Sequence, residues 1–432
     1  MSVAYFGRRS LENHMARNGN VQTPATPTRD ALVEAAVAGI SRDGLDDLTL
    51  RDVATAAGCS PAGVFLYFAG KRELIAEAMR AALEEDAAWH DSLDHTIDGL
   101  TLSSRSLLDL VSSYLRLRSI CRTGPFWSEI LFKAADVDDS VEPLRQWISR
   151  REAFWRNHLE RMGLDGTNAR TLNTYVMMEE VYSFSLWDGL DYVLLVGETL
   201  RALVARLTNA SPDNFGSEIT SFMSRQSVEA HALALQDETS SLKEQLLEVA
   251  IPEILKGGIR SLNLRRVAKR ANRSLSMITY HFGDTGSFIN EAVWRALFKG
   301  IPKEIDPNSG GGVAFPTLQE WADRLGELID PRGDEHPAGF YIGVARLTGQ
   351  AALQARRVPE LKPLILHLRK IEGSGTYRAS QTIWPPSCSI ARSAAAAFGI
   401  WVKGQAVMNE TVCDDEPVRG PGIEHVVKKL LS

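Results

Sequence analysis

The feature that most constrains this chain is one residue pattern that occurs twice. Residues 29–75 align with residues 243–289 without a gap when the 432-residue sequence is shifted by 214 positions. We call these segments the first module and the second module. The matching pairs include Leu32 and Leu246, Ala36 and Ala250, Ile40 and Ile254, Gly44 and Gly258, Val53 and Val267, and Phe68 and Phe282. Only two copies exist, at a period far longer than the roughly 20–50 residues of solenoid repeats, so we expect two tandem units.

The start of the module predicts a helix with one buried side. Leu32, Ala36 and Ile40 recur every fourth residue, as apolar residues do along one side of a helix. Gly44 follows, and glycine just beyond a helix suits a left-handed C-terminal cap. The pattern therefore predicts a first helix that ends close to residue 43.

Capping residues predict a second helix in each module. Thr49 is suited to the N-cap, and Asp52, three positions later, completes a capping box. In the second module Asn263 keeps the cap, whereas Arg266 replaces the acid. We expect the helix in both copies and the box only in the first.

A third helix is predicted after a short turn. Gly58 breaks the second helix, and Ser60 followed by Pro61 is typical of an N-cap and a first helical turn. Four small or apolar residues are expected to face inward between these helices: Val53, Ala54, Ala57 and Val64. This layout is a helix-turn-helix, in which the second of the two helices enters the major groove of DNA.

Residues 49–74, TLRDVATAAGCSPAGVFLYFAGKREL, resemble the N-terminal signature of TetR-type regulators. Phe65 stands where that family usually has a phosphate-contacting tyrosine, and Tyr67 stands at the customary histidine or tyrosine. The resemblance implies double-stranded operator DNA as the partner. The implied DNA-binding residues of the first module are Thr49, Arg51, Ser60, Pro61, Ala62, Gly63, Phe65, Leu66, Tyr67 and Lys71.

The second module resembles the same signature less closely, chiefly over residues 278–282. Asn272 replaces the turn glycine, Thr279 the tyrosine and Thr285 the lysine, which removes one implied phosphate contact. The corresponding candidates for DNA binding are Asn263, Arg265, Arg273, Ser274, Leu275, Ser276, Thr279, Tyr280 and His281. The alternative is that the second module has lost DNA binding and is retained only for the structure of the protein.

Local charge favours DNA binding by the second module. Residues 41–75 contain four basic and five acidic residues, whereas residues 255–289 contain seven basic residues and only one acid, Asp284. Some of the seven must point away from DNA, because Arg265 to Arg273 covers more than one side of a helix. For the first module, a basic N-terminal arm (residues 1–26) is a possible aid.

The segment after the first module is rich in aromatic residues. The family resemblance implies an effector pocket inside such a helical bundle, and a small apolar or aromatic effector would suit it. The candidate ligand-binding residues are Trp127, Phe154, Met177, Met178, Glu180, Tyr182, Phe184 and Trp187. Glu179 is an alternative polar anchor. For any single aromatic residue, a role in the core is the favoured reading.

Several classes of function find no support in the sequence. We find no apolar stretch long enough to cross a membrane, no histidine pair with metal-ligand spacing, and no nucleotide-binding or hydrolase motif. We therefore expect no enzyme, no metal and no cofactor. The cysteines are scattered, which favours reduced thiols and a cytoplasmic location. The net charge of −6 does not exclude DNA binding, which depends on local basic patches.

These observations predict an all-α protein with two tandem units. The expected division is an arm (1–26), the first helix-turn-helix domain (27–75), a helical body (76–208), a linker (209–241), a second helix-turn-helix domain (242–289) and a second body (290–432). The expected function is a ligand-responsive transcription regulator that acts as a repressor, in which one chain forms a pseudo-dimer on a non-palindromic operator. The alternative is a homodimer in which only the first module binds DNA.

Overall fold

The chain is built from helices. The computed structural model describes residues 28–134, 137–210, 216–236, 241–299, 317–330, 339–382, 384, 390–412 and 421–431. These residues form α-helices and short 3-10 helices, with no strand among them. The all-α prediction is confirmed. The expected N-terminal arm, residues 1–26, lies outside the described residues.

The first module forms three short helices and the beginning of a long one: α1 (Arg29–Asp43), α2 (Leu50–Ala56), α3 (Pro61–Val64) and α4 (Lys71–Ile97). Leu32, Ala36 and Ile40 are fully buried, as their spacing predicted. Gly44 ends α1 at φ 90°, and its N–H donates to the carbonyl of Ile40 at 2.9 Å. A side chain at Gly44 would be strained at this φ and would also meet the Arg357 guanidinium group.

Five helices complete the first half of the chain: α5 (Ser106–Ile120), α6 (Thr123–Leu131), α7 (Val141–Arg161), α8 (Ala169–Leu186) and α9 (Leu190–Leu207). Helix α8 is buried along its whole length apart from Arg170. A helix covered on all sides lies in the core of a larger assembly of helices, so α8 is central to the fold.

The second module has nearly the same helix boundaries as the first: α11 (Ser241–Gly257), the 3-10 helix η4 (Ile259–Ser261), α12 (Leu264–Arg270), α13 (Ser276–Phe282) and α14 (Thr285–Phe298). Helix α12 begins and ends 214 positions after α2, and α14 begins 214 positions after α4. The backbone also matches at the turns, because Gly258 and Asn272 have positive φ, as do Gly44 and Gly58. Asparagine tolerates this left-handed conformation better than most residues.

The remaining helices are α10 (Glu218–Gln236), α15 (Leu318–Leu328), α16 (Phe340–Ala355), η5 (Pro359–Leu361), α17 (Lys362–Ile371), α18 (Ser374–Thr382), α19 (Arg392–Val412) and α20 (Pro421–Leu431). Helix α10 corrects the expectation of a linker over residues 209–241. The polar residues on either side of it suggested a continuous loop. Between them Thr220, Met223 and Ser227 are buried at helical spacing, and α10 packs on α9, α17 and α19.

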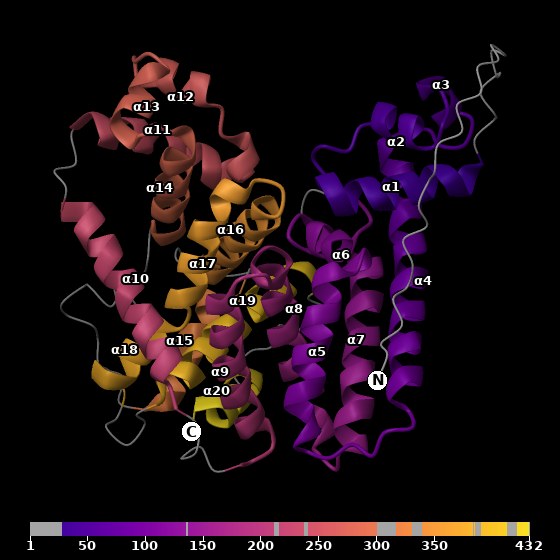
Figure 1. Cartoon of the computed structure of the whole chain (residues 1–432), viewed down its shortest axis with the longest axis vertical. Helices are drawn as coiled ribbons and strands as arrows, with labels where there is room; N and C mark the ends of the chain where they lie inside the picture. The colour runs from indigo at the N-terminus through magenta and orange to yellow at the C-terminus, as the bar shows by residue number, and fades with distance from the viewer. Residues whose placement is uncertain are drawn as a thin grey trace.

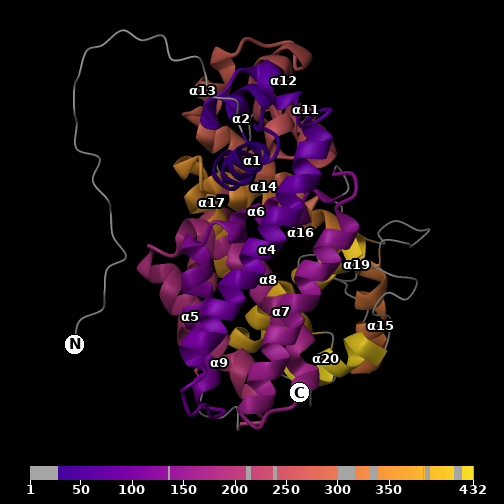
Figure 2. The same cartoon turned by 90° about the vertical axis from the view of Figure 1, so that its right-hand side faces the viewer.

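The two modules lie at the same end of the molecule. Figure 1 shows α2 and α3 on one side and α12 and α13 on the other, with the remaining helices below them. Figure 2, turned by 90°, also places both modules at this end. The helices of the two halves of the chain meet beneath them, where α8 packs on α16, α17 and α19, and α9 packs on α19 and α20.

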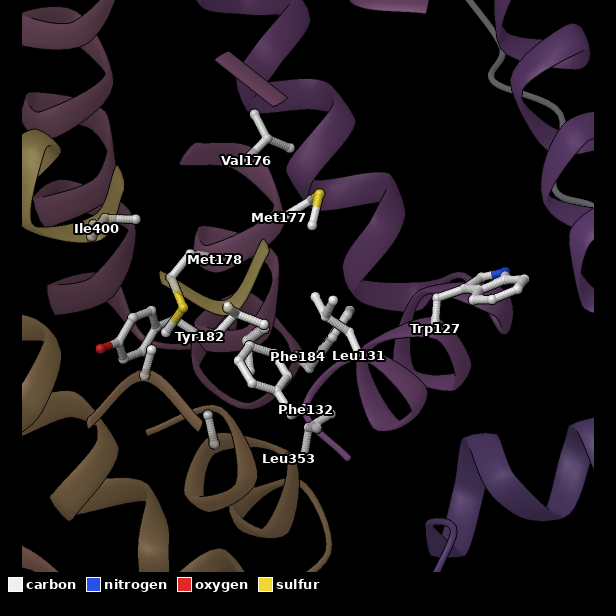
Figure 3. Close-up of a cluster of buried hydrophobic side chains, with 14 of the residues drawn as sticks. Trp127, Leu131, Phe132, Val176, Met177, Met178, Tyr182, Phe184, Leu353 and Ile400 are labelled. Carbon is white, nitrogen blue, oxygen red and sulfur yellow. The ribbon is translucent and has the colours of Figure 1, made fainter. Parts of the chain in front are cut away.

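Close contacts join the halves. A Cβ atom at Gly404 of α19 would lie 2.4 Å from the carbonyl oxygen of Thr174 in α8, so glycine permits this approach of the two backbones. Figure 3 shows the apolar cluster here, in which Phe132, Met178 and Leu353 come from distant parts of the sequence. Apolar burial on this scale is the main force that holds helices together.

A fully buried ion pair crosses the same contact between the halves. The guanidinium group of Arg369 in α17 donates to both carboxylate oxygens of Glu179 in α8, each at 3.0 Å. The hydroxyls of Tyr175 and Tyr192 also donate to this carboxylate. Although burial alone lowers the pKa of Arg369, the Glu179 carboxylate holds it above its usual value. The polar groups of this part of the core are therefore paired across the two halves.

Candidate nucleic-acid interface

The N-cap predicted for α2 is confirmed, whereas the Asp52 carboxylate bonds the Thr49 hydroxyl and not the backbone N–H that defines a capping box. The Thr49 side chain accepts a hydrogen bond from the Asp52 N–H at 3.1 Å, and the Thr49 hydroxyl donates to the Asp52 carboxylate at 2.5 Å. The acid thus reaches the hydroxyl of the cap residue. Val53 and Ala54 are buried, and Gly58 turns the chain at φ 72°. This turn directs the chain into α3.

Helix α3 is short, and the turn that follows it presents apolar side chains to solvent. Val64 and Phe68 anchor it in the core of the module, at 0% and 1% exposure. Phe65 and Leu66 are 59% and 70% exposed. Ser60, Pro61 and Ala62 are also exposed, and Tyr67 is half-buried. An exposed apolar surface on a short helix is suited to contacts with thymine methyl groups and sugars.

One residue expected on the exposed side of α3 lies inside. Gly63 is buried together with its neighbour Val64. Helix α3 packs on α2, and the side of α3 that carries Gly63 and Val64 faces the interior of the module. Gly63 is therefore not placed to contact a base.

The basic residues of the first module have different environments. Arg51 is exposed in the first turn of α2. Lys71, expected at a phosphate, donates from Nζ to the carbonyl of Leu45 at 3.1 Å, and burial lowers its pKa. Arg29 pairs with Glu77 and lies over the ring of Phe68. Arg51 is therefore the most accessible cation of the three.

Helix α12 has the same cap geometry as α2. The Asn263 side chain accepts from the Arg266 N–H at 3.0 Å, as the repeat predicted. In α13, Ile278 is fully buried and holds the helix in the module. On the exposed side Tyr280 is 79% and Leu275 is 41% exposed. Ser274, Ser276 and Thr279 are exposed as well.

His281 is less accessible than its neighbour. Its side chain is half-buried, and its ring contacts Tyr280 edge-on at a centroid distance of 5.0 Å. Its Nε2 atom is enclosed and has no hydrogen-bond partner within the described part of the chain. Tyr280 is therefore better placed than His281 to reach a base edge.

The basic residues of the second module divide between two sides, as expected from their spacing. Arg266 and Arg270 fold back onto Glu253, at 2.9 and 3.1 Å, and the hydrogen bond from Arg266 lowers the pKa of this carboxyl group. A second set is exposed on α12 and on the turn that follows it: Arg265, Lys269 and Arg273. A cluster of exposed cations beside α13 favours contact with phosphates.

The candidate effector residues lie in α6, in α7 and along α8, and Trp187 follows directly after α8. Trp187 is half-buried, and the other seven are buried. Glu180 is not free to act as an anchor in this structure, because Arg118 and Arg151 donate to it at 2.8 and 3.1 Å. The alternative anchor, Glu179, is held by Arg369. None of the eight residues lines either of two surface pockets, one beside Glu129 and Arg357 and the other beside Leu194 and Phe222.

Comparison with known proteins supports a class for the first module. Residues 32–78 match the model of the bacterial regulatory proteins of the tetR family. This match supports a DNA-binding transcriptional regulator whose N-terminal domain is of TetR type. No curated protein matches the chain.

The described residues contain neither a candidate membrane span nor a candidate metal cluster. Within the described ranges, no helix combines the length and the apolar character required to cross a membrane. The same residues contain no group of three or more histidine, cysteine or acidic side chains arranged to hold a metal ion.

Proposed function

We propose that this chain is a transcription regulator that binds one operator as a single-chain pseudo-dimer. The observation that carries the proposal is the position of two helix-turn-helix modules at one end of a single body of packed helices. A regulator of this class needs two recognition helices about 34 Å apart, one helical turn of DNA. Here one chain supplies both.

The contact between the halves takes the place of a dimer interface. Helices α8 and α9 of the first half pack on α16, α17 and α19 of the second. The fully buried pair of Glu179 and Arg369 and the close approach at Gly404 lie in this contact. Because both recognition surfaces belong to one body, they approach DNA together.

The two recognition surfaces are unequal, which favours an operator without a clean palindrome. The first presents Phe65 and Leu66, and the second presents Tyr280, with a hydroxyl group that can bond a base edge or a phosphate. Neither module offers an arginine in the middle of its recognition helix, so methyl contacts and DNA shape contribute much of the specificity. Exposed cations beside α13 add salt-dependent affinity.

Response to a small apolar effector is the second part of the proposal. The bundle of α6, α7 and α8 is its site, with the aromatic and methionine residues named above as the lining. In the described state seven of these residues are buried in the core, so effector entry requires α8 or its neighbours to move. Since α8 also contacts the second half, such a movement would change the separation of the modules.

The alternative is a homodimer of chains in which only the first module contacts DNA. Exposed apolar residues on α9, among them Leu190 at 71% exposure, favour a further contact surface on the molecule. In that arrangement the second module stabilises the fold and leaves the operator symmetric.

Footprinting on the DNA upstream of its own gene separates these alternatives. Matched substitutions at equivalent positions are Leu66→Ala and Tyr280→Ala, which remove side chains that are 70% and 79% exposed. If both modules bind, each substitution erases protection over a different half of one site. Leu100→Ala, in the loop at the end of α4 that is remote from the first module, is the control and leaves the footprint intact. Symmetric protection that only Leu66→Ala abolishes would support the homodimer.

A further inference from the structure

A polar pocket lies between the two modules and the bodies that carry them. The first module contributes Asp46, from the loop that follows α1, and the second contributes residues 254–260, the end of α11 and its following loop. Helix α6 and the residues just after it contribute Glu129 and Lys133, and α16 and its end contribute residues between 343 and 357. We call this the junction pocket. Its walls come from equivalent loops of the two modules, which follow Gly44 and Gly258.

The junction pocket is small and carries an excess of basic groups. Its volume is about 190 Å³. This is the space of roughly six water molecules and is below the roughly 300–1,000 Å³ of pockets for drug-sized ligands. The charged residues that line it are Lys133, Lys256, Arg260, Arg346 and Arg357 against Asp46 and Glu129. Arg260 and Arg346 also pair with Asp47 and Glu410, which lie just outside the lining, so the bases exceed these acids by one. A small anion fits both the volume and the charge.

Arg357 is the central cation of this pocket. It pairs with Glu129 and donates to the carbonyl of Asp43 at 2.9 Å, so it ties α16 to the end of α1. Its Nε atom is enclosed and has no hydrogen-bond partner among the described residues. Burial lowers the pKa of Arg357 in spite of the nearby carboxylates of Asp43, Asp46 and Asp47.

The same groups hold the loop of the first module. Glu129 accepts from the N–H of Leu45 at 3.3 Å, and Lys133 pairs with Asp46. From the second module, Arg260 pairs with Asp47. An anion among these cations would therefore act directly on the contacts that set the position of one module relative to the other.

We propose that the junction pocket binds a small carboxylate or phosphate compound through Arg357, Lys133 and Lys256. The ligand adds the negative charge that the pocket lacks and bridges the loops of the two modules. Its occupancy fixes their separation and so adjusts DNA affinity. This last effect rests on the proposed function, whereas binding of the anion does not. None of the eight candidate effector residues lines this pocket, although α6 contributes Glu129 to it.

Thermal unfolding of the full chain tests the binding without DNA. Inorganic phosphate and citrate are the probes, titrated at constant ionic strength against sodium chloride. The expected result is a rise in melting temperature that saturates for at least one probe, because a ligand that binds only the native state stabilises it. No saturable rise with either probe would overturn the proposal.

Variants locate the site. Lys256→Ala changes an exposed residue of the pocket and is expected to weaken probe binding at least threefold, and Arg357→Gln is expected to abolish it. Lys299→Ala, an exposed lysine just after α14, is the matched control and leaves binding unchanged. Binding that persists in both pocket variants contradicts the assignment. Binding that is lost instead in Arg265→Ala would place the anion on the DNA-binding surface and would also overturn it.

Discussion

The buried pair of Glu179 and Arg369 gives the most direct test of how the halves are held together. The substitution Glu179→Ala leaves Arg369, which is fully buried, without its carboxylate partner. The hydroxyls of Tyr175 and Tyr192 lose their acceptor as well. Removing one partner of a buried ion pair costs about 3–5 kcal/mol, because an uncompensated charge stays in the core.

The expected change in melting temperature follows from the size of the chain. At about 2.1 cal/mol/K per residue, the 432 residues give an unfolding entropy of roughly 0.9 kcal/mol/K. A loss of 3–5 kcal/mol therefore lowers the melting temperature by about 3–6 °C. Differential scanning calorimetry measures this shift, and urea unfolding gives an independent value.

Two further variants test whether the loss of stability comes from the unpaired buried charge. Asp188→Ala removes an exposed partner of Lys362, an ion pair at 3.2 Å that also joins the two halves, and is expected to cost less than about 1 kcal/mol. The double variant Glu179→Leu with Arg369→Met removes both buried charges and is expected to recover most of the lost stability. A shift for Glu179→Ala no larger than that of Asp188→Ala would refute the reasoning.

Three shorter predictions concern the first module, the core and DNA. Thr49→Ala removes the cap of α2 and is expected to lower the unfolding free energy by about 1 kcal/mol, measured by urea titration, with Thr49→Ser as the control that keeps it. Arg118 holds the pKa of Asp86 well below its usual value despite burial. The ionised Asp86 carboxylate therefore stabilises the fold at pH values above the unfolded pKa of about 3.9, and this stabilisation is lost as the pH falls below that value. An acid-unfolding curve as steep in Asp86→Asn as in the wild type would contradict this prediction. Arg51→Ala and Arg265→Ala are each expected to reduce the slope of log affinity against log salt by about 0.9 in binding titrations, and an unchanged slope would remove that residue from the phosphate contacts.

Local sequence signals predicted the geometry of the modules well. Thr49 and Asn263 are N-caps, and Gly44 ends α1 at a positive φ although with an extended ψ, because each depends on residues a few positions away. The burial of Leu32 and Ile40 follows in the same way from helical spacing. Such features need no knowledge of the rest of the fold.

Features that depend on distant residues were not predictable from one sequence. Glu179 and Arg369 are 190 positions apart, so nothing near either residue indicates that its charge is paired. Lys71 matches a position of the family signature, yet it bonds the carbonyl of Leu45, 26 positions away. The eight candidate effector residues stay a prediction, because their burial is compatible with both a core and a closed pocket.

The covalent link between the halves has a consequence for how the contact at α8 can evolve. In a symmetric homodimer every surface residue must be compatible with a second copy of the same surface, so a change on one side is always a change on both. Here Glu179 and Arg369 are encoded separately, and either side can vary alone. Assembly is also independent of dilution, because a peptide linkage keeps the partners at a high effective concentration even when a cell holds only a few copies of the protein.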